Sequence, residues 1–393
     1  MKTFLEIHVL QNYAPSNLNR DDTGAPKDAF FGGFRRARIS SQCTKRAIRE
    51  YFKAKNRQLF SNSTKRIVDE LKLKLQPKLK DVKGFSQDNL LKVIEAAINC
   101  IGSGDKKVKV EKDKKTGQMK TDVLLFLSQS EIDGLASVIE ESFDGLLKSK
   151  IPTEIIEKVR EALAGKENKS RLTLDIALFG RMLAVMPEKN QNAACQVAHA
   201  LSTHAIEREF DFYTAIDDLK PEETSGSDMI GTIEFNSACF YRYAVVDYKK
   251  LIENLQPSNP NDHQIINDGL KSFLEGFIIA EPTGKQNSFA AHNAPEFVAI
   301  SVRQETAPRN LSNAFEIPVK ARNEKSLTKE SAIKMAAKAK ALDELYDTTP
   351  NSQYACSEDI FEKDEKVKGL GINAKNIPAL IKWAIEELEK KGA

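Results

Sequence analysis

The apolar pattern of this chain changes twice along its length, and that change constrains the fold more than any other feature. Near the N-terminus, Phe4–Leu10 alternates between two sets of side chains, which predicts a half-buried strand. From about Asn56 to Ser170 the composition shifts to helix formers, with Lys-rich segments and few aromatic residues. Alternation then returns. These shifts predict a β-containing body interrupted by a largely helical insertion.

The body is predicted to be α+β. Further strands are expected at Leu172–Leu178, Glu209–Asp218, Met229–Tyr248 and Glu296–Arg303, and helices at Asn192–Ala205, Ile265–Ile279, Lys329–Tyr346 and Pro378–Lys390. With the insertions set aside, the core order is strand, helix, strand, strand, helix, strand, which indicates a ferredoxin-like or RRM-type sheet. Ile206–Thr232 is expected to project as a hairpin.

The segment Ser16–Phe52 is strongly basic. Between Arg35 and Arg57, nine Lys or Arg residues accompany a single acid, Glu50. Arg35, Arg36 and Arg38 would bring cations to the start of a helix, where free N–H groups also favour phosphate. The pair Gly32–Gly33 would let the backbone approach a ligand closely. A solvated basic surface and a groove that grips phosphates both fit this segment.

A helix is predicted from Ser41 onward, with Ser40 or Ser41 as its N-cap. Its apolar stripe is formed by four residues, Ala47, Ile48, Tyr51 and Phe52. A second stripe is formed by Gln42, Lys45, Arg49 and Lys53. Cations spaced by four residues repel one another on a helix, so this stripe is expected to meet an anionic partner.

The whole-chain composition describes an ordinary globular protein. Its 393 residues are 41% hydrophobic and 29% charged, and the net charge of +3 means that any nucleic-acid site depends on where the cations lie. The five Cys residues form no CxxC pair, which suits a reducing cytoplasm. Glu6 and His8 interrupt the apolar run that a signal peptide would need, and no apolar segment approaches membrane-spanning length. A cytoplasmic protein without membrane contact is expected.

No catalytic or metal-binding motif is recognised in the sequence. His199 and His204 would not share a face of the predicted helix, and no Cys with ligand spacing accompanies them. Asp21 and Asp22 could hold a divalent ion, but Arg20 and Lys27 flank them, which favours a salt-bridged loop. We therefore expect no metal, no cofactor and no enzymatic activity.

Several apolar side chains allow two interpretations. Tyr241 and Tyr243 lie on one face of a predicted strand and could form core or stack on bases. The aromatic residues of the predicted hairpin, Phe210, Phe212 and Tyr213, could pack under it, contact another chain or wedge between bases. The hairpin tip is acidic, with Glu222, Glu223 and Asp228. Met182 could fill the core or stack on a base.

Long blocks of this sequence resemble the guide-RNA-binding backbone subunit of the type I-E CRISPR Cascade complex, the CasC family. The first block reads IHVL, PSNLNRDD, KDAFFGGFRRARISSQ and KRAIR in order. Later blocks are Asp175–Met182, Ala198–His204, Asp211–Leu219, Phe240–Ala244, Gly284–Gln286 and Leu311–Glu316. They follow the family's order from Phe4 to Lys320, whereas the insertion and the region after Lys320 depart from it.

The resemblance implies a hand-like subunit. Residues 1–55, 171–205 and 233–320 would form an RRM-like palm, residues 56–170 helical fingers, residues 206–232 a thumb and residues 321–393 a C-terminal helical segment. Family members polymerise along the spacer of a CRISPR RNA, and each thumb reaches over the neighbouring palm and kinks the guide. The guide bases between the kinks then pair with a target DNA strand. Other Cascade subunits and a recruited helicase-nuclease complete the partners.

The resemblance also implies roles for individual residues. Those expected to bind the guide are Arg20, Lys27, Ser40, Gln42, Lys45, Arg46 and Arg49. Met182, Phe212 and Tyr213 would separate bases at each kink. Two alternatives stay open. One is an RRM-type CRISPR endonuclease that acts on guide or target, for which only His8 and Asp21 are candidates. The other is a structural protein that assembles through its hairpin without nucleic acid.

Overall fold

The computed structural model of the protein describes residues 2–55, 60–103, 106–163, 172–215, 229–255, 264–321, 326–349, 351–357 and 369–392. Two compact units are formed. Unit 1 comprises Met1–Tyr51, Cys195–Lys249 and Leu270–Ala393, and unit 2 comprises Phe52–Ala194 and Lys250–Gly269. None of the helices in the described part of the chain combines the length and apolar character that crossing a membrane requires. The assignment of palm, fingers, thumb and tail stays a prediction.

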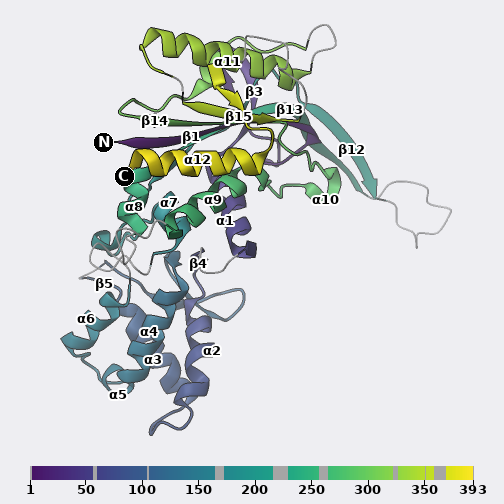
Figure 1. Ribbon diagram of the computed structural model, residues 1–393. Helices are drawn as coiled ribbons and strands as arrows, with labels where there is room; N and C mark the ends of the chain where they lie inside the picture. The colour runs from purple at the N-terminus through teal and green to yellow at the C-terminus, as the bar shows by residue number, and fades with distance from the viewer. Residues whose placement is uncertain are drawn as a thin grey trace, which may run out of the picture. The chain divides into compact units, whose positions relative to one another are not determined.

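Unit 1 is built on one large mixed sheet (Figure 1). Its strands are β1 (Thr3–Ser16), β2 (Asp28–Phe31), β3 (Phe34–Ile39), β10 (Cys195–Val197), β11 (Ala200–Ser202), β12 (Glu209–Ala215), β13 (Met229–Asp247), β14 (Phe297–Gln304), β15 (Ser352–Cys356) and β16 (Ile372–Asn373). The order is β16-β15-β14-β1-β13-β11-β3-β2, and β10 and β12 also pair with β13. The pairs are antiparallel except for β15 with β16. An α+β fold is thereby confirmed.

Helices cover both faces of this sheet. The helices lying wholly or partly in unit 1 are α1 (Ser41–Lys55), α8 (Tyr248–Leu255), α9 (Gln264–Ile279), α10 (Gln286–Phe289), η4 (Leu311–Phe315), α11 (Leu327–Leu345) and α12 (Ile377–Gly392). On one face, Leu10 packs with Phe315 of η4 and Met335 of α11. On the other face, α12 packs against β14, β1 and β15 (Figure 1).

The prediction of a half-buried first strand is wrong, because β1 is covered on both sides. Glu6 and His8 are 0% and 1% exposed. The hydroxyl of Tyr243 donates to the Glu6 carboxylate (2.7 Å), and His8 Nδ1 lies 2.9 Å from the hydroxyl of Tyr241. Both tyrosines are buried, so the core interpretation holds for them. Both faces of β1 are therefore buried, and the alternation reflects an apolar face and a face that carries the buried polar side chains Glu6 and His8.

Two elements of the predicted core have the wrong type. Leu172–Leu178 is predicted as a strand, but the structure has helix α7 (Leu174–Phe179) in unit 2. Every residue from Leu174 to Leu178 is buried, and Asp175 accepts hydrogen bonds from the backbone and side chain of Ser61. A short segment that is buried all round has no exposed side to reveal its period.

The predicted helix at Asn192–Ala205 is also wrong, since β10 and β11 occupy this segment. Cys195 pairs with Val246, and Leu201 pairs with Tyr241, so both short strands add to β13. Pairing with β13 supplies backbone hydrogen bonds that a local helix would otherwise have provided. In contrast, the predicted helices in the tail are confirmed by α11 and α12.

Unit 2 is mainly helical. Its helices are α2 (Ile67–Leu79), α3 (Gln87–Asn99), α4 (Gln129–Glu141), α5 (Phe143–Leu146), α6 (Thr153–Glu161), α7 and η3 (Pro187–Lys189), and its strands are β4 (Asn62–Thr64), β5 (Gly102–Ser103), β6 (Lys106–Lys107), β7 (Val110–Lys112), β8 (Met119–Thr121) and β9 (Leu125–Leu127). Leu71, Ile94 and Leu135 represent the buried faces of α2, α3 and α4 in one apolar core. The helix-rich composition predicted for residues 56–170 is therefore found in the described part of this segment.

Candidate nucleic-acid interface

The loop after β1 is ordered by its own hydrogen bonds. Asn19 accepts two hydrogen bonds in this loop. Its backbone carbonyl accepts from Lys27 N (2.8 Å), and its side-chain oxygen accepts from Ser40 N (2.8 Å). Asp21 Oδ1 accepts from the backbone N and the hydroxyl of Thr23 (2.9 and 2.7 Å). Hydrogen bonds, and not the predicted salt bridge, thus hold Asp21. The loop presents Arg20 to solvent.

The hairpin β2–β3 occupies the part of the basic segment that precedes α1. Gly32 and Gly33 form its two-residue turn, and both have positive φ (59° and 82°), as a type I′ turn requires. A Cβ at Gly32 would lie 2.2 Å from the carbonyl oxygen of Glu316. This close approach is made to the protein's own backbone, whereas a close ligand approach was the expected reason for the glycine pair.

The three arginines of β3 do not form one cationic surface. Arg36 is fully buried, and its guanidinium donates to the carbonyl oxygens of Ser202 (3.1 Å) and Phe315 (2.7 Å). Arg35 pairs with Asp28. Arg36 therefore stabilises unit 1 internally, and its expected role as a cation beside the helix is wrong.

Helix α1 begins with the predicted cap. The hydroxyl of Ser40 accepts a hydrogen bond from Cys43 N (3.3 Å), so Ser40 is the N-cap. At about 100° per residue, α1 has three faces. Ile48 and Phe52 are completely buried, and Lys45 and Arg49 lie on the next face, half-buried. Ala47 and Tyr51, predicted in the apolar stripe, instead face a cavity in unit 1.

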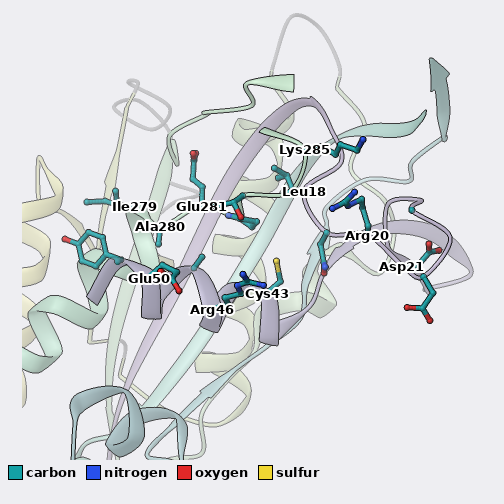
Figure 2. A pocket seen from close by; sticks show the side chains of 18 of the residues that line it. Leu18, Arg20, Asp21, Cys43, Arg46, Glu50, Ile279, Ala280, Glu281 and Lys285 are labelled. Atoms are coloured by element: carbon teal, nitrogen blue, oxygen red, sulfur yellow. The ribbon is translucent and has the colours of Figure 1, made fainter. Parts of the chain in front are cut away.

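This cavity of about 1190 Å³ is formed by three segments of unit 1 (Figure 2). They are residues 18–24, the third face of α1 and residues 279–285. Arg20, Arg46 and Lys285 enter the lining from these three segments, as Figure 2 shows. Three cations from distant parts of the sequence thus share one opening, with acidic residues beside them: Asp21, Asp22, Glu50 and Glu281.

Lys285 was not among the predicted guide-binding residues. It follows Gly284, where a Cβ would lie 2.2 Å from the carbonyl oxygen of Leu18. This close packing brings Lys285 beside the loop that carries Arg20. Lys285 itself has a left-handed backbone (φ 52°). The signal available in the sequence was the Gly-Lys pair, because glycine permits a close backbone approach and the lysine next to it then lies near the same segment.

A second group of cations lies outside the lining of this cavity. Arg38 Nη1 is 2.9 Å from His199 Nδ1. Burial lowers the pKa of His199, and the charges of Arg38 and Lys27 lower it further. Burial raises the pKa of Cys195 to about 12, and the charge of Lys45 opposes this rise. Lys27 thus lies near Arg38 and His199, and Lys45 lies near β10.

The predicted guide-binding residues are consequently divided. Arg20 and Arg46 line the cavity, whereas Lys27, Lys45 and Arg49 are not among its lining residues. Gln42 is exposed at the start of α1, and Ser40 is buried as its cap. Their contact with RNA stays a prediction.

Met182 is 77% exposed in unit 2, so the core interpretation is wrong for it. Its two neighbours hold it in place. Arg181 is buried in an ion pair with Glu131 (2.8 Å), and Leu183 is buried in the core of unit 2. Gly180, with φ 79°, ends α7 just before them. The structure therefore presents an apolar side chain to solvent on a firmly anchored segment.

The projecting hairpin is formed by β12 and β13, which extend from the sheet of unit 1 (Figure 1). Phe212 is 73% exposed and Tyr213 is 42% exposed. As neighbours in a strand, they point to opposite faces of the ribbon. Tyr213 covers its cross-strand partner, since a Cβ at Gly231 would lie 2.3 Å from the Tyr213 ring. The predicted acidic tip lies outside the described residues.

The base of the hairpin is tied to β2 by charge. Arg208 pairs with Asp28 (2.7 Å) and with Glu234 (3.0 Å). Burial favours a raised pKa for Asp28, but hydrogen bonds from Arg208 and Arg35 outweigh it and lower this pKa. The carboxylate of Asp28 is therefore charged and binds two arginines, Arg35 of β3 and Arg208 just before β12.

The candidate catalytic and metal-binding groups are engaged elsewhere. Burial lowers the pKa of His8 to about 3, with the charge of Arg303 adding to this effect. Nε2 of His204 accepts a hydrogen bond from Cys239 N (3.2 Å). His204 follows β11 and does not lie on the predicted helix. Among the described residues, no three His, Cys, Asp or Glu side chains lie together as a metal site would need.

Comparison with known proteins identifies the family. A model of the family described as CT1975-like protein matches residues 5–383. The chain belongs to the CT1975-like family. This family member is also similar to a chain from a solved "CRISPR RNA-guided surveillance complex, pre-nicking", with 31% identity, a TM-score of 0.83, and coverage of 98% of this chain and 99% of that one.

A second solved chain, from a "CRISPR RNA-guided surveillance complex", is 27% identical to this CT1975-like protein with a TM-score of 0.73. The match covers 98% of this chain and 99% of that chain. A comparison with curated proteins found no match. The resemblance stated from the sequence is confirmed at the level of CRISPR surveillance-complex subunits.

Proposed function

We propose that this chain is the guide-RNA-binding backbone subunit of a type I-E CRISPR Cascade complex, the CasC family, acting in the cytoplasm. It polymerises along the spacer of a CRISPR RNA, grips guide phosphates and presents bases to a target DNA strand. Its partners are further copies of itself, other Cascade subunits and a recruited helicase-nuclease. It has no catalytic role of its own.

The observation that carries this proposal is the cavity where Arg20, Arg46 and Lys285 meet beside the N-terminus of α1. Side chains that bind phosphates position a nucleic acid without reading its sequence, as a protein that accepts any spacer must do. The first turn of α1, from which Cys43 enters the lining, adds the partial positive charge of a helix N-terminus. The adjacent carboxylates would limit how closely phosphates approach the acidic part of the opening.

The topology supports an RRM-type palm. The central strands lie in the order β14-β1-β13-β11. Helix α1 lies in the sequence between β1 and β11, and α9 lies between β13 and β14, which gives strand, helix, strand, strand, helix, strand. The predicted order thus fits after β11 replaces Leu172–Leu178 as the second strand.

Co-expression with a CRISPR array tests this function. We expect the purified protein to carry CRISPR RNA, and sequencing to recover different spacers without base preference. The Arg20→Ala/Arg46→Ala variant should retain less RNA, and the loss should be similar for unrelated spacers. A protein that purifies free of RNA, or a variant that discriminates strongly among spacers, would contradict the proposal.

A further inference from the structure

The cavity proposed to grip the guide carries carboxylates beside its cations. Glu50 is the one acid of the basic segment Arg35–Arg57, and it lies on the face of α1 that lines this cavity. A carboxylate repels phosphates, so it weakens a grip that depends on charge alone. The position of Glu50 is therefore unfavourable unless some part of the guide donates a hydrogen bond to it.

Two other carboxylates of the cavity are engaged by residues of this chain. Asp21 accepts hydrogen bonds from the backbone N and hydroxyl of Thr23, and the carboxylate of Glu281 lies 2.8 Å from Nδ1 of His292. Glu50 is exposed, and within the described part of the chain it takes part in no ion pair. Its carboxylate is thus available to a ligand that enters the cavity.

Glu50 stands between a cation and an apolar surface. Arg46 lies one turn earlier on the same face of α1, and side chains four residues apart on a helix have Cβ atoms about 5–6 Å apart. On the other side of Glu50, Ile279 and Ala280 also line the cavity, and Ile279 is 57% exposed (Figure 2). Phosphate and sugar alternate along a nucleic-acid strand. A strand whose phosphate meets Arg46 would therefore bring a neighbouring sugar to Glu50, beside side chains that exclude water.

The chemistry of the nucleic-acid backbone identifies the group that Glu50 would bind. An ionised carboxylate only accepts hydrogen bonds. Phosphate oxygens also only accept, and deoxyribose within a strand has no donor. The 2′-hydroxyl of ribose is a donor, and it is the group by which a protein distinguishes RNA from DNA at a given site. A carboxylate next to a phosphate contact thus favours a ribose strand and penalises a deoxyribose strand.

We propose that Glu50 selects RNA over DNA as the guide by accepting a hydrogen bond from a ribose 2′-hydroxyl, while Arg46 binds a neighbouring phosphate. The inference rests on the proposed function, because it takes the guide as the ligand of this cavity. It adds a specificity-determining residue to a site that otherwise offers charge contacts. Recognition of the sugar is independent of the base, so any spacer sequence remains acceptable.

The test compares Glu50→Ala with Asp22→Ala, which removes an exposed carboxylate from the loop side of the same lining. Binding of the full chain, freed of copurifying RNA, is measured for a fluorescent single strand of arbitrary sequence. The strand is supplied as RNA, as DNA and as RNA whose 2′-hydroxyls are replaced by fluorine, which keeps the sugar conformation of RNA but removes the donor. The wild type should prefer RNA to the fluorinated strand, and Glu50→Ala should reduce this preference by about tenfold, as loss of a hydrogen bond to a charged group predicts.

Asp22→Ala should keep the wild-type preference, although both substitutions remove one negative charge and should strengthen binding of every strand. Equal loss of preference in the two variants would assign it to the charge of the cavity and overturn the inference. A wild type that binds RNA and the fluorinated strand alike would also overturn it, while leaving the proposed function intact. A wild type that binds none of the strands would contradict the proposed function itself, and the inference with it.

Discussion

Arg181 and Met182 are neighbours in the sequence, yet Arg181 is buried with Glu131 and Met182 is 77% exposed. Glu131 also accepts from Ser128 N in the capping box of α4, so this carboxylate joins two elements of unit 2. The charged Arg181 thus has a structural role, whereas the apolar Met182 is available to a partner.

Substitution of these two residues should change stability to very different extents. Arg181→Ala would leave the carboxylate of Glu131 buried without its charge partner, and we expect a loss of about 3–5 kcal/mol in the free energy of unfolding. Met182→Ala should change it by less than about 0.5 kcal/mol. Urea denaturation of both variants measures this difference. Comparable losses in the two variants would show that Met182 has a structural role.

His8 should make stability depend on pH. An unfolded chain binds a proton at His8 near pH 6.5, whereas the folded protein does so only at about 3. The unfolded state therefore binds more protons between these values, and the contribution of His8 is lost as pH falls from about 6.5 toward 3. In this window the free energy of unfolding falls by up to about 1.4 kcal/mol per pH unit through His8.

The measurement is urea unfolding of wild type and His8→Gln at several pH values between about 7 and 5. Carboxylate titration is common to both proteins, so the difference between them isolates His8. We expect the free energy of unfolding of His8→Gln to depend less steeply on pH than that of the wild type. Parallel curves would contradict the buried neutral state of His8.

At the scale of elements, the ribbon of β12 and β13 combines a fixed base with exposed aromatic side chains. Arg208 ties the base to Asp28, and Phe210 and Phe212 share one exposed face of β12. Tyr213 lies on the opposite face over Gly231. The two residues predicted to act together as a wedge therefore have different surroundings within their own chain.

Phe212→Ala should leave the melting temperature of the isolated chain nearly unchanged, because the ring is mostly exposed. It should nevertheless impair assembly on CRISPR RNA, since a stacked base contributes on the order of 1–3 kcal/mol at each contact. Native gel analysis of assembly and thermal unfolding measure the two effects. Tyr213→Ala is the matched variant, and we expect it to destabilise the ribbon by uncovering Gly231. A destabilised Phe212→Ala chain that assembles normally would reject the wedge.

At the scale of the whole molecule, the two candidate catalytic residues are both committed to structure. His8 is buried among tyrosines, and Asp21 orders its loop by accepting from Thr23. The chain's contribution is then proposed to be binding and assembly, and cleavage would belong to a partner.

We accordingly expect purified protein to cut neither labelled RNA nor DNA when incubated with Mg²⁺. Asp21→Ala and His8→Gln are the matched variants for any activity that appears. Hydrolysis by the wild type that either substitution abolishes would favour the endonuclease alternative. Hydrolysis that persists in both variants would indicate a contaminating nuclease.

Local sequence determined much of this protein. The helical spacing after Ser40 and its hydroxyl cap are local properties, and so are α9, α11 and α12 and the strands β13 and β14. The two-glycine turn between β2 and β3 was not predicted, although positive φ at two successive positions favours glycine and the signal is local. Such features need only neighbours in the chain.

Tertiary structure alone decided the type of Leu174–Phe179, the strands β10 and β11, and the burial of Arg36. In each case the deciding partner lies far away in the sequence, such as β13 for Cys195–Val197 or the Phe315 carbonyl for Arg36. Periodicity reports an element only when one side meets solvent, and these segments are covered on more than one side. The meeting of Arg20, Arg46 and Lys285 has the same origin, because three separate segments must pack together before their charges share one cavity.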